Sequence, residues 1–170
     1  ARDALVKDPT KPMLPRSYRE TFFPGSTFKI VTAAAAFDHA PELTKKSYPS
    51  VPAIGLPQSD KSLRNFGGST CGGQIKELMK VSCNTGFAQM GMDMGGVALA
   101  DEANAFGFNK VPPLDQPFVA KSNFPSGDSL KKNKAFTAYS AIGQQDVSAT
   151  PLQMALVVSG IANDGIIMKP

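Results

Sequence analysis

The sequence has few residues that commonly bind metals or form disulfides: one histidine, His39, and two cysteines, Cys71 and Cys83. The cysteines form no Cys-x-x-Cys pair and no cluster with histidine, so a structural zinc site is not expected. A Ser-His-Asp triad would have to use His39, which falls at the end of an expected helix just before Pro41. The sequence therefore argues against metal and histidine-based chemistry, and we expect no cofactor.

The chain also lacks a long apolar run and a strong charge. Its longest apolar stretch, Ala33 to Phe37 with Ile30 and Val31 shortly before it, is too short to span a bilayer, and no signal peptide is visible. The net charge is +4, and the basic residues near the start alternate with proline and acidic residues, so we expect no nucleic-acid partner. With 170 residues, of which 42% are hydrophobic, the composition indicates one globular domain.

One helix combines an apolar sequence with two isolated polar side chains. Pro24 and Gly25 end whatever precedes them, and an alanine-rich stretch from about Ser26 to Asp38 then predicts a buried helix. Ser26 and Lys29 lie three residues apart, on one face of its first turn. A hydroxyl beside a desolvated amine is a candidate pair of nucleophile and general base.

The same Ser-x-x-Lys spacing occurs a second time, at Ser129 and Lys132. That copy lies in a polar stretch rich in lysine and glycine, and we expect it to be a solvated loop. A motif is only a hypothesis until its surroundings support it. The buried helix after the Pro-Gly break therefore favours Ser26 and Lys29.

The remaining sequence predicts further helices separated by irregular segments. The apolar spacing predicts helices over 75–82, from about 84 to 94, over 97–106 with Gly107 ending it, and from 151 to 163. The last begins with a predicted capping box, Thr150 to Gln153. Residues 1–22, 41–73 and 108–134 are expected to be irregular, and 166–168 to open a strand.

A second polar cluster, Ser82-Cys83-Asn84, falls between two of these helices. One interpretation is local capping, in which Ser82 ends one helix and Asn84 or Thr85 caps the next. The other interpretation is that the corner between two apolar helices carries polar side chains to the Ser26–Lys29 site.

Several blocks of the sequence together resemble one family. They occur in a matching order over nearly the whole chain: Pro24-Gly25-Ser26-Thr27-Phe28-Lys29, Ser82-Cys83-Asn84-Thr85, Ala141-Ile142-Gly143-Gln144, Thr150-Pro151-Leu152-Gln153-Met154-Ala155 and Ile161-Ala162-Asn163-Asp164-Gly165. The chain resembles the transpeptidase domain of penicillin-binding proteins, of the class B, cell-division type, and the penicillin-binding protein A group in particular. The resemblance implies an α+β fold of the penicillin-binding and serine β-lactamase type.

The resemblance also implies a role for each site residue. Ser26 would be the acylated nucleophile, with its own backbone N–H as one oxyanion donor, and Lys29 would take the serine proton. Ser82 would relay the proton to the leaving D-alanine, and Asn84 would hold the substrate amide. The implied substrates are peptidoglycan stem peptides, with β-lactams trapped at the same serine, in an extracytoplasmic protein whose membrane anchor lies outside this chain.

One motif of the family is missing. The sequence has no Lys-Thr-Gly or Lys-Ser-Gly, and Lys121-Ser122-Asn123 lacks the glycine. We therefore expect residues 1–170 to be the N-terminal, mostly helical portion of a single transpeptidase domain, without the sheet-forming C-terminal part. Its partners would be the rest of its own domain and cell-division proteins, and alone it should neither cross-link nor acylate efficiently.

Two further expectations depend on the resemblance. Cell-wall enzymes act where disulfides persist, so a Cys71–Cys83 bond is expected to pin the second motif. The alternatives are a serine β-lactamase, although no Glu-x-x-x-Asn element is evident, and a non-catalytic penicillin-sensing or division scaffold domain.

Overall fold

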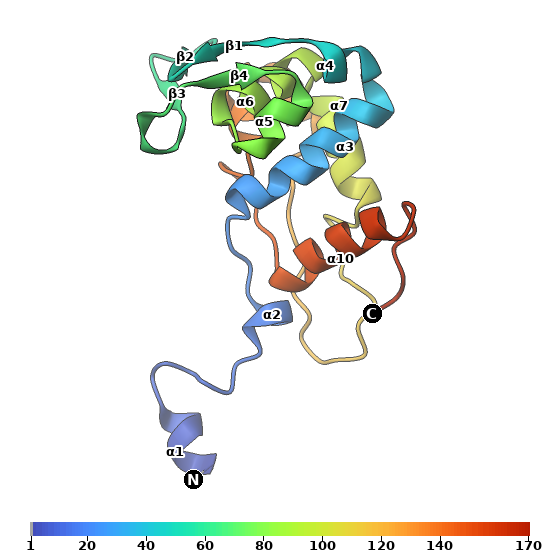
Figure 1. The fold of residues 1–170 in the computed structure, drawn as a ribbon. Coiled ribbons are helices and arrows are strands. Elements are labelled where there is room, and N and C mark those ends of the chain that lie inside the picture. Colours follow the sequence, from blue (N-terminus) through green and yellow to red (C-terminus); the bar gives the residue numbers. More distant parts are fainter. Residues whose placement is uncertain (1) are drawn as a thin grey trace.

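The computed structural model describes residues 2–170, which are mainly helical (Figure 1). Its α-helices are α1 (Arg2–Lys7), α2 (Arg16–Arg19), α3 (Lys29–His39), α4 (Pro41–Lys45), α5 (Ile75–Lys80), α6 (Asn84–Met94), α7 (Gly96–Ala105), α8 (Gly127–Lys132), α9 (Lys134–Ser140) and α10 (Pro151–Ala162). Two 3-10 helices, η1 (Gly25–Phe28) and η2 (Phe66–Gly68), and four short strands complete the described elements: β1 (Tyr48–Val51), β2 (Ala53–Gly55), β3 (Ser62–Arg64) and β4 (Cys71–Gly73).

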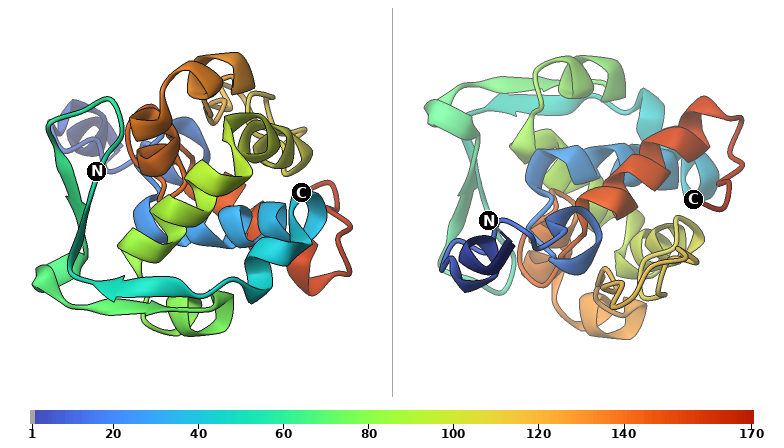
Figure 2. Two further views of the ribbon diagram at one scale, coloured as in Figure 1. Left: turned by 90° about the horizontal axis from the view of Figure 1, so that it is seen from above. Right: turned by 90° about the horizontal axis from the view of Figure 1, so that it is seen from below.

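Helix α3 lies at the centre of the molecule, with α6 and α7 against it and α10 on its other side (Figures 1 and 2). Two separate apolar clusters meet at this helix. Ala33 and Ala36 belong to the cluster beneath the strands, and Val31 and Ala35 belong to the cluster shared with α7. Small alanine side chains let neighbouring elements approach α3 from both sides, which explains why an alanine-rich helix forms the middle of the core.

The second cluster holds the start of α3 in place. The Phe28 ring stacks on Phe124 with centroids 5.2 Å apart, and Phe108 meets Phe28 edge-on at 5.5 Å. All three rings are buried. Aromatic pairs in these geometries add stability beyond their buried area, so the residue before Lys29 has a fixed position.

The expectation that residues 41–73 are irregular is wrong. The segment contains α4 and two antiparallel pairs, β1 with β4 and β2 with β3. Strands of three or four residues are too short to show clear alternation, and the β1–β4 register is interrupted between Tyr48 and Val51. Gly72 allows the two strands to approach, because a Cβ there would lie 2.6 Å from the Pro49 backbone.

Three other expected irregular or extended segments also need correction. Residues 1–22 contain α1, which lies apart from the body of the molecule, and α2 (Figure 1). The second Ser-x-x-Lys copy lies on helix α8 and not in a loop, and α9 follows it; both helices have side-chain caps, from Ser126 and Asn133. Residues 166–168 form no strand. Apolar periodicity is a weak signal in helices of four to seven residues, and among the helices this short only α5 is predicted from its apolar spacing.

The longer predicted helices are confirmed to within a few residues. The first begins as the 3-10 turn η1 and continues as α3, and Gly107 follows α7 with φ of +94°. Only one of the two hydrogen bonds of the predicted capping box at Thr150 forms. The Thr150 hydroxyl accepts from the Gln153 N–H at 3.0 Å, but the Gln153 side chain donates to the carbonyl oxygen of Phe106 at 2.7 Å.

Candidate active site

The turn that carries Ser26 rests on a second turn from much later in the sequence. Gly25 adopts φ of +54°, and its N–H donates to the Gly143 carbonyl oxygen at 2.9 Å. Gly143 itself has φ of +69°, and a Cβ there would lie 2.7 Å from the Phe28 Cβ. Only glycine combines this backbone conformation with such a close approach. The turn after α9 therefore fixes the turn that presents Ser26.

Ser26 is exposed, whereas Lys29 is 1% exposed. The Lys29 ammonium nitrogen lies within hydrogen-bonding distance of four oxygen atoms. These are Ser26 Oγ at 3.1 Å, Ser82 Oγ at 3.0 Å, the Ser82 carbonyl oxygen at 2.6 Å and Asn84 Oδ1 at 2.6 Å. The structure thus brings together all four residues that the two motifs supply.

Burial lowers the pKa of Lys29 from its ordinary value of 10.5 to about 8. None of its hydrogen-bond partners carries a negative charge that would stabilise the ammonium, and the Phe87 ring centroid is 5.8 Å from Nζ. The neutral amine has two donors and one lone pair. Its two N–H groups can donate to the Ser82 carbonyl oxygen and to Asn84 Oδ1, each 2.6 Å away, because these oxygens can only accept. The lone pair then remains available to accept from a serine hydroxyl.

Ser82 occupies a backbone position that usually belongs to glycine. Its φ is +54°. The Ser82 N–H donates to the Met79 carbonyl oxygen, and the Cys83 N–H donates to the Leu78 carbonyl oxygen. These two bonds are the Schellman arrangement that ends a helix, with Ser82 at the left-handed residue. A non-glycine residue in this conformation costs about 1–2 kcal/mol. The strained turn directs both Ser82 oxygens toward Lys29.

Asn84 does not cap the next helix, and neither does Thr85, so the capping interpretation of these two residues is wrong. Cys83 is the N-cap of α6 and makes no side-chain cap. The Asn84 amide instead spans two other segments: its Nδ2 donates to the Arg64 carbonyl oxygen at 3.0 Å, and its Oδ1 accepts from Lys29. The bond to Arg64 determines which end of the amide faces the lysine.

Cys71 and Cys83 form a disulfide with Cα atoms 5.8 Å apart. Cys83 is the middle residue of the second motif and is 1% exposed. The bond therefore joins β4 to the turn that carries Ser82 and Asn84.

Sequence reasoning missed one buried polar residue beside this turn. Asn65, which follows β3, is 5% exposed and accepts a hydrogen bond from the Thr85 N–H at 2.9 Å. Its sequence neighbours, Phe66-Gly67-Gly68, indicated only a turn, and no local pattern signals a contact twenty residues away.

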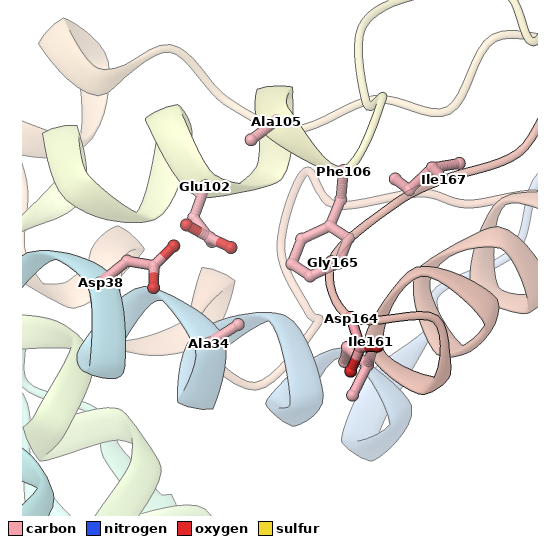
Figure 3. A pocket seen from close by; sticks show the side chains of 9 residues that line it. All are labelled: Ala34, Asp38, Glu102, Ala105, Phe106, Ile161, Asp164, Gly165 and Ile167. Atoms are coloured by element: carbon pink, nitrogen blue, oxygen red, sulfur yellow. The ribbon is translucent and has the colours of Figure 1, made fainter.

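The other polar candidates lie away from this site. The Nε2 of His39 is 3.3 Å from the Glu102 carboxylate at the far end of α3. Beside them a cavity of about 400 Å³ lies between α3, α7 and α10, and Asp38 and Glu102 face one another across it (Figure 3). Burial, with a smaller contribution from Asp38, raises the pKa of Glu102. Nine residues of helix separate Asp38 from Lys29, about 14 Å at 1.5 Å per residue, so this cavity is distinct from the Ser26 site.

Comparison with known families decides what this arrangement is. The family "Penicillin binding protein transpeptidase domain" matches residues 2–170. The chain belongs to the penicillin-binding protein transpeptidase family.

Individual relatives agree with this family. The chain is 42% identical to the peptidoglycan D,D-transpeptidase PbpA of Mycolicibacterium smegmatis, over 100% of the chain and 34% of the relative. It is 40% identical to PbpA of Mycobacterium tuberculosis, over 98% of the chain and 34% of the relative. The chain thus spans about a third of the length of these transpeptidases.

Solved structures of the family have the same fold. Penicillin-binding protein A of M. tuberculosis, solved as a penicillin G acyl-enzyme complex, superposes with a TM-score of 0.90 and 37% identity, covering 100% of this chain and 39% of that one. The transpeptidase domain from Eggerthella lenta superposes with a TM-score of 0.87 and 30% identity, covering 99% and 43%. The expected class B transpeptidase fold is confirmed, and the described residues of this chain are mainly helical.

Proposed function

We propose that this chain carries the nucleophile, base and second motif of a peptidoglycan D,D-transpeptidase. The observation that carries the proposal is the buried Lys29 amine, 3.1 Å from the Ser26 hydroxyl and held by Ser82 and Asn84. A lysine with a pKa near 8 is partly neutral at physiological pH and can act as a base without a histidine. The names of the mycobacterial relatives support the same activity.

In the proposed acylation, the neutral Lys29 amine takes the proton of Ser26 as Oγ attacks the penultimate D-alanine carbonyl of a stem peptide. Oγ forms the acyl bond, the carbon–nitrogen bond to the last D-alanine breaks, and that nitrogen receives the proton. The acyl-enzyme then transfers to an amine of a neighbouring strand, which forms the cross-link and restores the Ser26 hydroxyl.

The surrounding groups have distinct proposed roles in these steps. Ser82 Oγ, 3.0 Å from Lys29, lies in position to pass the proton on toward the leaving nitrogen. The Asn84 amide, next to it, would hold the substrate amide. Gly25 and Thr27 donate their N–H groups to Gly143 and Pro24, whereas the Ser26 N–H makes no hydrogen bond within residues 2–170. That free donor supports its role as one half of the oxyanion hole.

We further propose that residues 1–170 are one portion of a single transpeptidase domain. The length ratio to the relatives and the missing Lys-Thr-Gly motif support this division. Helix α10 supports it independently, because Val158 and Ile161 on this apolar helix are 51% and 48% exposed. A sheet formed by the rest of the domain would cover that face and supply the second oxyanion donor and a lysine for the substrate carboxylate.

The setting of the whole protein is part of the same proposal. The relatives are named as peptidoglycan transpeptidases, and peptidoglycan lies outside the cytoplasm. We therefore propose an extracytoplasmic domain, with an anchor elsewhere in the full-length protein and cell-division proteins as partners. Among the described residues, no helix has both the length and the apolarity that a membrane span needs. The proposed β-lactam adduct at Ser26 is supported by the acyl-enzyme complexes of the M. tuberculosis protein.

Labelling with a fluorescent penicillin tests the proposal. The full-length protein should be labelled once per molecule at Ser26, and the 170-residue chain only weakly. Stoichiometric labelling of the isolated chain would overturn the proposed division of the domain, and an unlabelled full-length protein would overturn the function. Rapid hydrolysis of a chromogenic cephalosporin by the full-length protein would favour a β-lactamase instead.

The disulfide has its own test. Titration of free thiols in the 170-residue chain under oxidising, denaturing conditions should detect none, because Cys71 and Cys83 are the only cysteines of this chain. Two titratable thiols would contradict the bond.

A further inference from the structure

Two neighbouring residues at the end of β3 bind two neighbouring residues at the start of α6. The Arg64 carbonyl oxygen accepts from Asn84 Nδ2 at 3.0 Å, and Asn65 Oδ1 accepts from the Thr85 N–H at 2.9 Å. Asn84 is the residue whose Oδ1 faces the Lys29 amine. The β2–β3 hairpin is therefore connected to the active-site lysine through this pair of bonds.

Asn65 uses its whole side chain in this connection. In addition to the bond from Thr85, its Nδ2 donates to the carbonyl oxygens of Val51 and Ser69, each at 2.9 Å. Asn65 is 5% exposed, and replacement by alanine would remove its bonds to three backbone groups, of which the Thr85 N–H belongs to a buried residue. A carboxamide alone among the side chains offers two donors and an acceptor in this geometry, since a carboxylate would have no donor for the two carbonyls.

We propose that Asn65 is a positioning residue of this active site: it holds the start of α6 against β3 so that the Asn84 amide presents its oxygen to Lys29. Asn65 does not touch the lysine and acts only through its neighbours. Without it, the bond from Asn84 to Arg64 is no longer held in register and the amide is free to rotate. The Lys29 ammonium would then lose one of its two 2.6 Å acceptors.

The first test measures Lys29 directly and needs no catalysis. The full-length protein with lysine labelled at Cε is titrated by NMR, and Lys29 is assigned by its loss in the Lys29→Met variant. In the wild-type chain Lys29 should titrate near pH 8. In Asn65→Ala its pKa should fall by about half a unit or more, because the charged form has lost an acceptor.

Thr137 provides a control. It is 2% exposed, and its hydroxyl lies 2.9 Å from the Leu130 carbonyl oxygen and 3.1 Å from the Asn133 carbonyl oxygen. Thr137 lines a pocket with Met92 and Met94, at the opposite end of α6 from Asn84. Thr137→Val should therefore lower the melting temperature while leaving the Lys29 pKa unchanged. An unchanged Lys29 pKa in a folded Asn65→Ala chain, or an equal shift in Thr137→Val, overturns the proposal.

Asn65→Ser extends the test if the alanine variant does not fold. The serine side chain leaves a smaller cavity than alanine would, and the variant still lacks the two hydrogen bonds that Asn65 Nδ2 donates to the carbonyl oxygens of Val51 and Ser69. It should lower the Lys29 pKa in the same direction, and an unshifted folded chain would contradict the proposal.

The second test uses the full-length protein and depends on the proposed transpeptidase function. The second-order rate constant of acylation by a fluorescent penicillin should fall about tenfold or more in Asn65→Ser, because misplacing a reacting group by about 1 Å can reduce a rate a hundredfold. Thr137→Val should acylate at the wild-type rate. A wild-type protein that does not acylate would overturn the transpeptidase function while the NMR result still decides the role of Asn65.

Discussion

The two Ser-x-x-Lys segments of this chain have the same spacing and both lie on helices, yet their surroundings differ in every respect that matters for chemistry. Lys29 is buried and its amine contacts oxygens of Ser26, Ser82 and Asn84. Lys132 is exposed at the end of α8, and the Ser129 hydroxyl donates to the carbonyl oxygen of Ser126 within the same turn.

The difference shows that the Ser-x-x-Lys spacing only places a serine and a lysine side chain close together. A serine and a lysine one turn apart become a nucleophile and a base when the amine loses its water and a second segment supplies hydrogen-bond acceptors without charge. At the first copy, the neighbouring core and the Ser82–Asn84 turn do both. At the second copy, the lysine is exposed to solvent and the serine hydroxyl donates to a backbone carbonyl oxygen of its own turn.

Removing each serine should give the largest contrast. In the full-length protein, Ser26→Ala should abolish covalent labelling by a fluorescent penicillin, because the proposed nucleophile is gone. Ser129→Ala should label at the wild-type rate. Labelling that persists in Ser26→Ala, or disappears in Ser129→Ala, would break the comparison.

Removing each lysine should give the next largest contrast. Lys29→Met keeps a similar length and apolar stem but has no base, so acylation should slow by about 100- to 10,000-fold. Lys132→Met should acylate normally, since its amine is in water. Stopped-flow measurement of acylation gives both rates, and equal losses in the two variants would contradict the distinction.

The folded-state pKa of Lys29 also predicts how stability depends on pH. Folded Lys29 binds its proton less tightly than in the unfolded chain, so between about pH 8 and 10.5 the unfolded chain holds more protons. The free energy of unfolding should therefore rise through this range, by about 3 kcal/mol at most for a shift of this size. Urea unfolding of the chain at pH 7.5 and 10 measures the rise.

The lysine variants separate this contribution from other titrations. Lys29→Met should remove most of the rise, and Lys132→Met should keep it. A rise that survives in Lys29→Met would mean that other groups are responsible.

The smallest effect is expected from replacing Ser82, which has no counterpart beside the second Ser-x-x-Lys segment. Ser82→Gly relieves the left-handed strain and should raise the free energy of unfolding by about 0.5–1 kcal/mol, the strain relieved less the extra entropy of glycine. Acylation should nevertheless slow, because the hydroxyl beside Lys29 is gone. Ser129→Gly on the exposed face of α8 should instead destabilise the chain by up to about 1 kcal/mol. Loss of stability in Ser82→Gly would contradict the strain at this turn.

Sequence reasoning reached most of the site but less of its support. Ser26 and Lys29 could be found because a proline–glycine break, an apolar helix and two polar residues one turn apart are all local signals. Ser82 and Asn84 taken alone indicate helix capping, since a helix-to-helix turn usually carries polar capping residues; the combination with Ser26 and Lys29, and then the family resemblance, favours them as site residues. Asn65 was missed because its partners, Val51, Ser69 and Thr85, come from three separate segments. The strands of residues 48–73 were missed for the same reason, because pairing between β1 and β4 is not visible in either strand alone.

The sequence by itself determined the main helices, the two polar motifs and the family, because turns, apolar periodicity and motif order are properties of neighbouring residues. The tertiary structure decided which Ser-x-x-Lys copy is buried, what Asn84 binds, and how the β2–β3 hairpin meets α6. These depend on contacts between residues 20 to 55 positions apart, which no local pattern encodes. The chemistry expected at Ser26 therefore begins in one short segment, but the state of Lys29 depends on the packing of the whole domain around it.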